Sequence, residues 1–222
     1  MSGALRILVT GFGPFPGAPY NPTTPLVKRL TQLRRPALDG IALAGHIFHV
    51  TYQTVDRELP DLIAQTRPHA LLMFGLASRT AHLRIETRAR NTITTHLPDA
   101  DGSRAQKTSI VHGADALFFG SHTSSLLQAA RSTGIDARLS RDAGAYLCNY
   151  LSWRAIEATQ RSDGPALASF IHVPLVARDG KARAAASDIT LEQLVDAGEA
   201  MLMEMVKLTR RAVMQGAHIE QH

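Results

Sequence analysis

Short apolar runs alternate with amphipathic stretches along this chain. Runs with the length and composition of buried strands lie at residues 6–10, 41–50, 70–74, 137–139 and 167–173. Between and after them, apolar residues recur at helical spacing at residues 24–30, 55–65, 123–133, 148–156 and 191–215. Strands that alternate with helices predict an α/β fold, with helices packed on a central sheet.

Local signals predict where some elements begin and end. Thr24 fits a helix N-cap and Pro25 the first helical position. Pro60 restricts where the second helix can begin, and Gly134 stands where a helix-ending glycine is expected. Residues 97–106 are polar and rich in Asp, Gly and Pro, which predicts a surface loop.

Size and composition indicate one soluble domain. A length of 222 residues, with 45% apolar and 19% charged residues, is typical of a globular protein. There is no internal repeat and no clear linker, so we expect one α/β domain over residues 1–222. No apolar run approaches the roughly 20 residues needed to cross a bilayer, and the first residues lack the apolar core of a signal peptide. The single cysteine cannot form an intrachain disulfide, so a cytoplasmic protein without membrane contact is expected.

The basic charge does not predict a nucleic-acid partner. The formal net charge is +5 and the sequence pI is about 9.8. However, the basic residues are scattered, with short pairs such as Arg34-Arg35 and Arg210-Arg211. Single-strand binders instead combine a continuous basic groove with interleaved aromatic residues. We therefore interpret the charge as a solvated surface and expect no nucleic-acid binding.

No metal or other cofactor is expected. One cysteine and the lack of a His-Glu-x-x-His pattern argue against a metal site. Gly11 and Gly13 are similar to the start of a dinucleotide-binding loop, but Pro16 occupies the third glycine position, where the helix should already have begun.

Cys148 lies where a turn runs into a helix, and Gly144 makes that turn flexible. A cysteine in the first turn of a helix faces unpaired backbone N–H groups and the positive end of the helix dipole. This environment favours the thiolate, which is the nucleophilic form. The alternative interpretation is a buried cysteine that packs as a small hydrophobic side chain.

His172 and Glu86 could complete a catalytic series with Cys148. His172 lies near the C-terminal end of an apolar strand, where open α/β sheets place their sites, and Glu86 lies in an extended segment. A thiol needs an imidazole to exchange its proton, and the imidazole needs an acceptor to orient it. The N–H groups of the Cys148 helix could bind a developing oxyanion. The alternatives are a structural histidine and a surface ion pair, because Glu86 is flanked by Arg84, Arg88 and Arg90.

Four blocks that together span most of the chain resemble the pyroglutamyl peptidase I family (pyrrolidone-carboxylate peptidases). They are residues 7–15 with Asn21 and Pro22, residues 75–77 with 86–91, residues 143–149, and residues 170–174. The last two blocks are specific, and the order and spacing of all four agree with the family. By this resemblance Cys148 is the nucleophile, His172 the general base and acid, and Glu86 the residue that orients His172.

The resemblance also implies fold, activity and assembly. The implied fold is a single α/β/α sandwich around a twisted, mostly parallel mixed sheet. The implied activity is that of a cytoplasmic, metal-free cysteine peptidase that removes an N-terminal pyroglutamate from peptides through a thioester. Members of the family are often homotetramers.

A substrate pocket follows from the same resemblance, with the flat lactam ring held between aromatic side chains. The matching positions are Phe12, Phe15, Asn21, Leu76 and Tyr146, and core packing is the alternative role for the aromatic ones. Three departures lie nearby: Leu76 replaces the usual Gln, residues 78–80 replace Gly-Gly-Arg, and His96 stands where an Arg is usual. They leave two further hypotheses open, a related cysteine amidase with altered acyl specificity and a non-catalytic member that only binds ligands.

Overall fold

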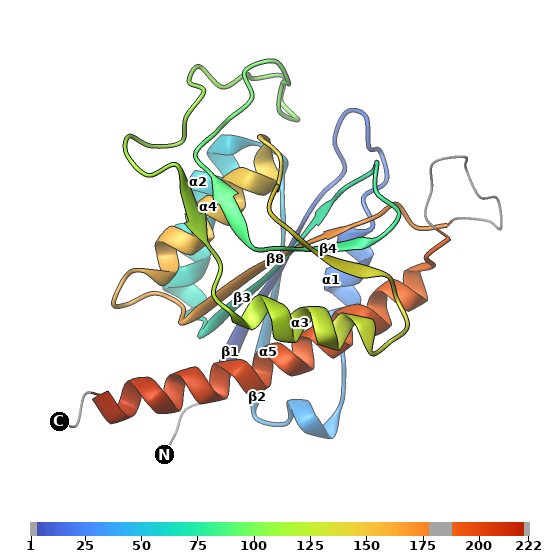
Figure 1. The fold of residues 1–222 in the computed structure, drawn as a ribbon, viewed down its shortest axis with the longest axis vertical. Helices are drawn as coiled ribbons and strands as arrows, with labels where there is room; N and C mark the ends of the chain where they lie inside the picture. Colours follow the sequence, from blue (N-terminus) through green and yellow to red (C-terminus); the bar gives the residue numbers. More distant parts are fainter. Residues whose placement is uncertain (1–3, 178–187, 220–222) are drawn as a thin grey trace.

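A mixed β-sheet forms the middle layer of the protein (Figure 1). In the computed structural model, which describes residues 4–177 and 188–219, its strands are, in spatial order, β2 (Ile41–Phe48), β1 (Leu5–Phe12), β3 (Ala70–Leu76), β8 (Leu167–Val173), β4 (Leu83–Glu86) and β7 (Ala137–Ser140). Neighbouring strands are parallel, except that β4 and β8 are antiparallel. The predicted α/β fold around a mostly parallel mixed sheet is therefore confirmed.

Helices cover both faces of the sheet. One face packs against α1 (Thr23–Thr31), α3 (His122–Arg131) and α5 (Leu191–Ile219), and the other against α2 (Tyr52–Thr66) and α4 (Leu147–Thr159). Figure 1 shows α3 beside α5, and α2 beside α4 across the sheet from them. Among the described residues, no helix combines the length and apolarity that a bilayer span requires.

The alternation of side chains along the strands decides which residues face α4. In β8, Ile171 belongs to the core on the α5 side and Phe170 to the core on the α4 side. Because side chains alternate along a strand, His172 shares the α4 side with Phe170. In β4, Leu83 and Ile85 belong to the α5 side, so Glu86 also faces α4.

A second, two-stranded sheet leads away from β4. It pairs β5 (Arg88–Arg90) with β6 (Ala116–Phe118), and no pattern in the sequence had indicated β6. Asn91 organises the long segment between these strands, since its side-chain oxygen accepts from the backbone of Ile110 and Val111. The predicted surface loop at residues 97–106 contains no helix or strand.

The predicted start of the first helix is wrong. The N-cap of α1 is Pro22, so Thr24 and Pro25 lie inside the helix rather than at its boundary. Asn21 accounts for the earlier start, because its side-chain oxygen accepts from the Thr23 backbone N–H at 3.1 Å and satisfies a donor of the first turn. A short 3₁₀ helix at Pro36–Leu38 precedes β2.

The second helix contains the proline that was expected to limit it. Thr51 caps α2 by accepting from the Thr54 backbone N–H at 3.1 Å, and Pro60 lies in the helix interior. Val55 and Leu59 before the proline are buried in the core on the α4 side, and Leu62 and Ile63 after it pack against the same core, so packing stabilises the helix on both sides of the proline.

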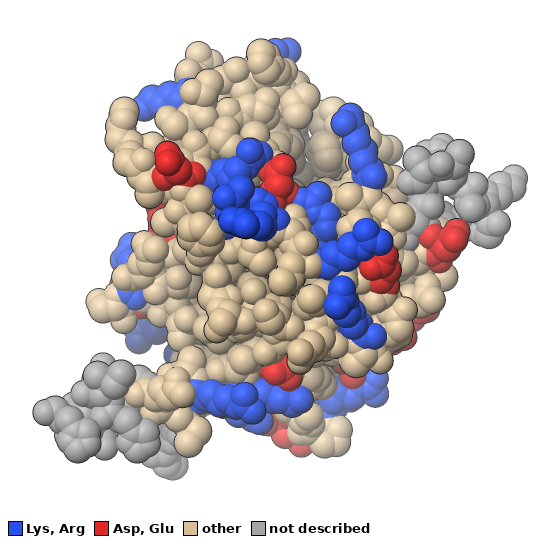
Figure 2. Space-filling model, viewed as in Figure 1, with Lys and Arg blue, Asp and Glu red and all other residues tan. Residues whose placement is uncertain are grey.

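Charged side chains are interspersed on the face seen in Figure 1. Figure 2 shows Lys and Arg in separate patches on this face, with Asp or Glu side chains beside several of them. Pairs such as Arg138 with Asp136 at 2.7 Å and Arg90 with Asp142 at 2.7 Å account for part of this pattern. Exposed pairs of this kind contribute little to stability, on the order of 0–1 kcal/mol each.

Candidate active site

The Cys148 sulfur lies over the C-terminal end of β3. Gly75 in β3 pairs with His172 in β8, so the two residues are neighbours across the sheet. A β-carbon placed on Gly75 would lie 2.7 Å from the Cys148 Sγ and 2.6 Å from the Phe170 ring. The sulfur therefore occupies the space above Gly75, immediately beside His172.

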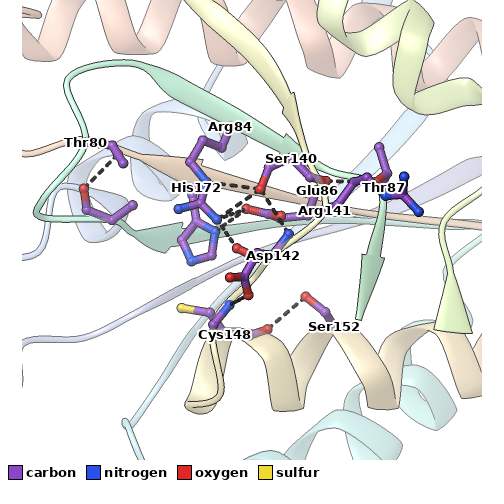
Figure 3. A network of polar contacts seen from close by, with 12 residues as sticks. Thr80, Arg84, Glu86, Thr87, Ser140, Arg141, Asp142, Cys148, Ser152 and His172 are labelled. Atoms are coloured by element: carbon purple, nitrogen blue, oxygen red, sulfur yellow. Dashed lines mark hydrogen bonds and ion pairs between the residues drawn. The ribbon is translucent and has the colours of Figure 1, made fainter. Parts of the chain in front are cut away.

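His172 contacts Glu86 on its other side. The His172 Nδ1 lies 2.8 Å from the Glu86 Oε1, and both side chains are buried. A carboxylate can only accept, so Nδ1 carries the proton and Nε2 is the ring nitrogen that can exchange a proton with Cys148. Figure 3 shows the imidazole between the Glu86 carboxylate and the Cys148 side chain.

The order of the strands produces this series. His172 is in β8, the strand between β3 and β4. Cys148 reaches it above Gly75 of β3, whereas Glu86 reaches it from β4. Cysteine, histidine and glutamate thus follow one another along the direction in which neighbouring strands are hydrogen-bonded.

The surroundings of His172 favour its charged form. Burial alone lowers its pKa, but the negative charge and hydrogen bond of Cys148 and the hydrogen bond and charge of Glu86 outweigh burial and raise the pKa to about 9. At neutral pH His172 is consequently favoured in its imidazolium form. This state is the one that a cysteine nucleophile requires.

The first turn of α4 presents free N–H groups beside the sulfur. The N-cap Tyr146 is extended and makes no side-chain capping bond, and Cys148 is the second residue of the helix. Gly144, in the turn before it, has a φ of +84°, a conformation that favours glycine. The predicted turn-to-helix environment of Cys148 is confirmed in this respect, and the uncapped N–H groups are suited to bind an oxyanion.

Asn149 anchors this turn to β5. Its side chain accepts from the Arg90 backbone N–H at 2.9 Å and donates to the carbonyls of Arg90 at 2.8 Å and Thr92 at 3.1 Å. The residue is fully buried, so its hydrogen bonds have no competition from water. Sequence reasoning assigned no role to it, although an asparagine early in a helix, next to the cysteine, was a usable signal.

Arg84 connects Glu86 to the loop before α4. Its Nη2 lies 2.9 Å from the Glu86 Oε1 and 3.0 Å from the Ser140 Oγ, and it also donates to the Asp142 carbonyl. Glu86 is fully buried, so the alternative interpretation of Glu86 as a surface ion-pair residue among arginines is wrong. The face alternation of β4 buries it, while the longer arginine reaches the protein surface.

The aromatic residues predicted for the pocket have two different settings. The rings of Phe15 and Tyr146 lie 6.5 Å apart, and the Tyr146 hydroxyl donates to the Pro98 carbonyl at 2.8 Å. Burial, Asp99 and Cys148 raise the pKa of Tyr146 to about 12, so its hydroxyl stays protonated. Phe12 is buried and packs against Phe48 with ring centroids 6.0 Å apart.

The other predicted pocket residues lie in the loop after β1 and at the end of β3. Asn21 is buried, and its amide donates to the Gly13 carbonyl at 3.0 Å, which fixes the loop that carries Phe15. Leu76 is partly exposed and directly follows Gly75. The departures from the family pattern at Arg79 and His96 are both exposed.

Two further residues of the site were missed. Gly75 interrupts an apolar strand, which is a known sign of a close approach by another group. Tyr52 packs edge-on against Tyr146 with ring centroids 6.1 Å apart, and no local pattern distinguished it. Within residues 4–177 and 188–219, no group of three or more His, Cys, Asp or Glu side chains could hold a metal ion.

Comparisons with known proteins agree on one family. A family model described as "Pyroglutamyl peptidase" matches residues 5–207. The pyrrolidone-carboxylate peptidase of Thermococcus kodakarensis is 32% identical over 171 residues, which cover 77% of this chain and 81% of that protein. The pyrrolidone-carboxylate peptidase of Thermococcus onnurineus is 29% identical over 204 residues, covering 91% of this chain and 100% of that protein.

Solved structures of the same kind share the fold. The pyrrolidone carboxyl peptidase of Fervidobacterium islandicum AW-1 superposes with a TM-score of 0.82 at 29% identity, covering 91% of this chain and 99% of that one. The enzyme of Thermococcus litoralis gives a TM-score of 0.83 at 25% identity, covering 93% and 96%.

Proposed function

The chain belongs to the pyroglutamyl peptidase family, and from this premise we propose that it removes N-terminal pyroglutamate from peptides with Cys148 as nucleophile. The observation that carries the proposal is the series formed by the partly buried Cys148 and the buried His172 and Glu86, in which the sulfur lies beside the imidazole and the carboxylate lies 2.8 Å from Nδ1.

The first half of the reaction forms a thioester. The Cys148 thiolate attacks the carbonyl carbon of the pyroglutamyl–peptide bond, and the carbonyl electron pair moves onto the oxygen. The N–H groups at the start of α4 stabilise that oxyanion. When the tetrahedral intermediate collapses, the C–N bond breaks and the His172 imidazolium gives its Nε2 proton to the leaving amine.

The second half releases pyroglutamate. His172, now neutral, takes a proton from a water molecule that attacks the thioester carbonyl, and the C–S bond then breaks to restore the thiolate. Glu86 accepts from Nδ1 in both halves, so it keeps the imidazole in one tautomer and supports the positive charge whenever His172 is protonated.

The lactam ring lies, in this proposal, beside Phe15 and Tyr146. Their rings are neighbours, and Tyr146 is two residues before Cys148. Aromatic faces suit a flat, largely apolar ring. Phe12 and Asn21 do not contact the lactam in this proposal, since both are buried and support the loop that carries Phe15.

Release of a fluorophore from a pyroglutamyl amide tests the activity. Wild-type protein should release it, and Cys148→Ser and Cys148→Ala should reduce release to background, because neither side chain provides a thiolate. Both variants should unfold at the wild-type denaturant concentration. Activity that survives Cys148→Ala would exclude Cys148 as the nucleophile.

A second candidate is a related amidase that prefers another acyl group, and Leu76 is the observation in its favour. Leu76 directly follows the glycine beneath the sulfur, and it is apolar where the family usually has an amide. A panel of amides with pyroglutamyl, prolyl, acetyl and larger lactam groups discriminates the two. The highest kcat/KM for the pyroglutamyl amide excludes this candidate.

We also carry the assembly and location of the family to this chain, as a cytoplasmic homotetramer. Light scattering after size-exclusion chromatography measures the mass directly, and a mass of one or two chains of 24.1 kDa would contradict the tetramer. Fractionation of the source cells tests the location.

A further inference from the structure

Arginines from one extended segment hold the loop that leads to Cys148. Arg84, Arg88 and Arg90 alternate with other residues along β4 and β5, and each donates to a backbone carbonyl of the loop at residues 141–144. The accepting carbonyls are those of Asp142, Arg141 and Gly144 respectively. Glu86 lies in the same segment, so the segment joins the carboxylate of the series to the loop of its nucleophile.

Arg84 differs from the other two because it also contacts Glu86. The Glu86 Oε1 forms an ion pair with the Arg84 Nη2 at 2.9 Å and accepts from the His172 Nδ1 at 2.8 Å. The buried Oε2 of the same carboxylate has no hydrogen-bond partner among the described residues. One carboxylate oxygen is therefore shared between a permanent cation and the catalytic imidazole (Figure 3).

The same guanidinium is fixed on its other side. Its Nε lies 3.2 Å and its Nη2 3.0 Å from the Ser140 Oγ, and the Ser140 hydroxyl also accepts from the Asp142 backbone N–H at 3.2 Å. Ser140 pairs with Glu86 in the register of β7 and β4. The planar fork of an arginine presents Nε and Nη2 to the Ser140 hydroxyl in one fixed geometry, whereas a lysine ammonium offers a single nitrogen on a flexible stem.

We propose that Arg84 is a positioning residue that sets the charge balance of the Glu86–His172–Cys148 series and fixes the nucleophile loop to it. This inference rests on the proposed function. The shifts it predicts in the ionisation of Cys148 and His172, however, apply to the enzyme without substrate. Arg84 acts through Glu86 and does not touch the sulfur. It lies on the β4 side of His172, whereas Cys148 lies on the β3 side.

The charges around the series define the expected effect. His172 faces the Glu86 carboxylate from β4 and the Cys148 sulfur from α4. Arg84 faces Glu86 and is close enough to His82 to lower the pKa of that histidine, after burial and Arg138. The carboxylate of Asp142, in the loop that Arg84 contacts, is paired with Arg90 at 2.7 Å.

Removing the Arg84 charge should shift both ionisations of the active form in the same direction. A nearby cation favours the thiolate and the carboxylate and disfavours the imidazolium. For Arg84→Gln we therefore expect the acid limb and the basic limb of the activity profile to move to higher pH, each by about one unit. At a fixed pH below the wild-type acid limb kcat should fall about tenfold, and KM should change little because Arg84 does not contact the proposed lactam site.

Two variants separate charge from loop anchoring. Arg84→Lys keeps the positive charge but loses the fork, so kcat should fall while both limbs stay at the wild-type pH. Arg88→Gln is the matched control, because Arg88 anchors the same loop through the Arg141 carbonyl at 2.8 Å and Glu86 is not among its partners. It should also leave the limbs in place.

Alkylation of Cys148 by iodoacetamide gives a readout that needs no substrate. The alkylation rate is proportional to the fraction of Cys148 in the thiolate form. The acid limb of its pH profile should therefore move to higher pH in Arg84→Gln and stay at the wild-type pH in Arg84→Lys and Arg88→Gln. If the pH profiles of Arg84→Gln and Arg88→Gln have the same limbs, the proposal is overturned and Arg84 is a structural residue. If the wild type shows a normal alkylation profile but no hydrolysis of pyroglutamyl amides, the proposed function fails and this inference is still decided by alkylation.

Ser140→Ala keeps the test possible if Arg84→Gln does not fold. It removes the hydroxyl that fixes the guanidinium and changes no charge. We expect a smaller upward shift of the acid limb, because a loosened arginine spends less time at Glu86. An unchanged limb in a soluble Ser140→Ala protein would count against the proposal.

Discussion

The Cys148 sulfur lies where a side chain at position 75 would have to be. A β-carbon on Gly75 would lie 2.7 Å from the Sγ and 2.6 Å from the Phe170 ring, closer than real side chains come. The sulfur touches the imidazole of the neighbouring strand only because residue 75 has no side chain.

Gly75→Ala should therefore remove activity with only moderate loss of stability. The methyl group must displace the sulfur or the Phe170 ring, and a misplacement of about 1 Å costs on the order of 100-fold in rate. Overpacking of this kind costs about 1–3 kcal/mol of unfolding free energy. Measurements of kcat, of the Cys148 alkylation rate and of urea unfolding check the three effects.

Gly134→Ala provides the matched control for this glycine. It follows α3 and has a φ of +85°, so alanine there is strained by about 1 kcal/mol, and a β-carbon at this position meets no atom within 4 Å and so does not approach Cys148. It should lower stability and leave kcat unchanged. If Gly75→Ala keeps wild-type kcat, the contact between Gly75 and the sulfur has no catalytic importance.

Much of the fold follows from local patterns, whereas the site depends on strand order. The runs that became β3 and β8 are mostly apolar because helices cover both faces of those strands, and this pattern is visible without knowing the partner strands. The meeting of Glu86 with His172 instead depends on β4 lying next to β8 in an antiparallel register. That pairing joins residues 86 positions apart, and no local periodicity encodes it.

Misses near the site have the same physical origin. β6 has three residues and exists through its pairing with β5, so its own composition is a weak signal. The start of α1 is decided by Asn21, whose side chain is held by the Gly13 carbonyl of the preceding loop. Arg84 resembled a solvent-exposed partner of Glu86, because the burial of that glutamate depends on β8 and β7, the strands that flank β4.

The negative charge of Glu86 should matter more for activity than the volume of its side chain. Glu86→Gln keeps the volume but can donate to Nδ1, which favours the wrong tautomer, so we expect kcat to fall by about 10²- to 10⁴-fold. It also removes one of the interactions that raise the His172 pKa, so the basic limb of residual activity should move below about pH 9. Arg84 loses its buried counter-charge, and unfolding free energy should fall by about 3–5 kcal/mol.

Glu58→Gln is the control for this change, since it breaks a histidine–glutamate pair elsewhere. The His46 Nε2 lies 2.9 Å from the Glu58 Oε2 at a partly exposed position between β2 and α2. Stability should change by about 1 kcal/mol or less, and kcat should be retained. Equal losses of activity in both glutamine variants would contradict a specific role for Glu86.

The rates of hydrolysis and of Cys148 alkylation should depend differently on pH at high pH. The His172 pKa is raised to about 9, so the imidazolium is present below that pH and is lost above it. Hydrolysis needs this proton for the leaving amine and should decline above about pH 9. Alkylation needs only the thiolate and should not decline there. Parallel decline of the two rates in one buffer series would show that His172 is not the general acid.

The ring of Tyr146 should contribute more to substrate binding than its hydroxyl. Tyr146→Phe keeps the contacts with Phe15 and Tyr52, at 6.5 Å and 6.1 Å between centroids, and loses only the hydrogen bond to the Pro98 carbonyl. KM for a pyroglutamyl amide should then change less than about threefold, since the lost hydrogen bond joins two residues of the protein and does not contact the proposed lactam. Tyr146→Ala removes the aromatic face, and KM should rise by about 10- to 100-fold with a smaller effect on kcat.

Because Tyr146 is also the N-cap of α4, the alkylation rate of Cys148 must be compared in both variants. A raised KM with an unchanged alkylation rate assigns the effect to the lactam site, whereas equal losses in both rates would mean that the ring only supports the cysteine turn.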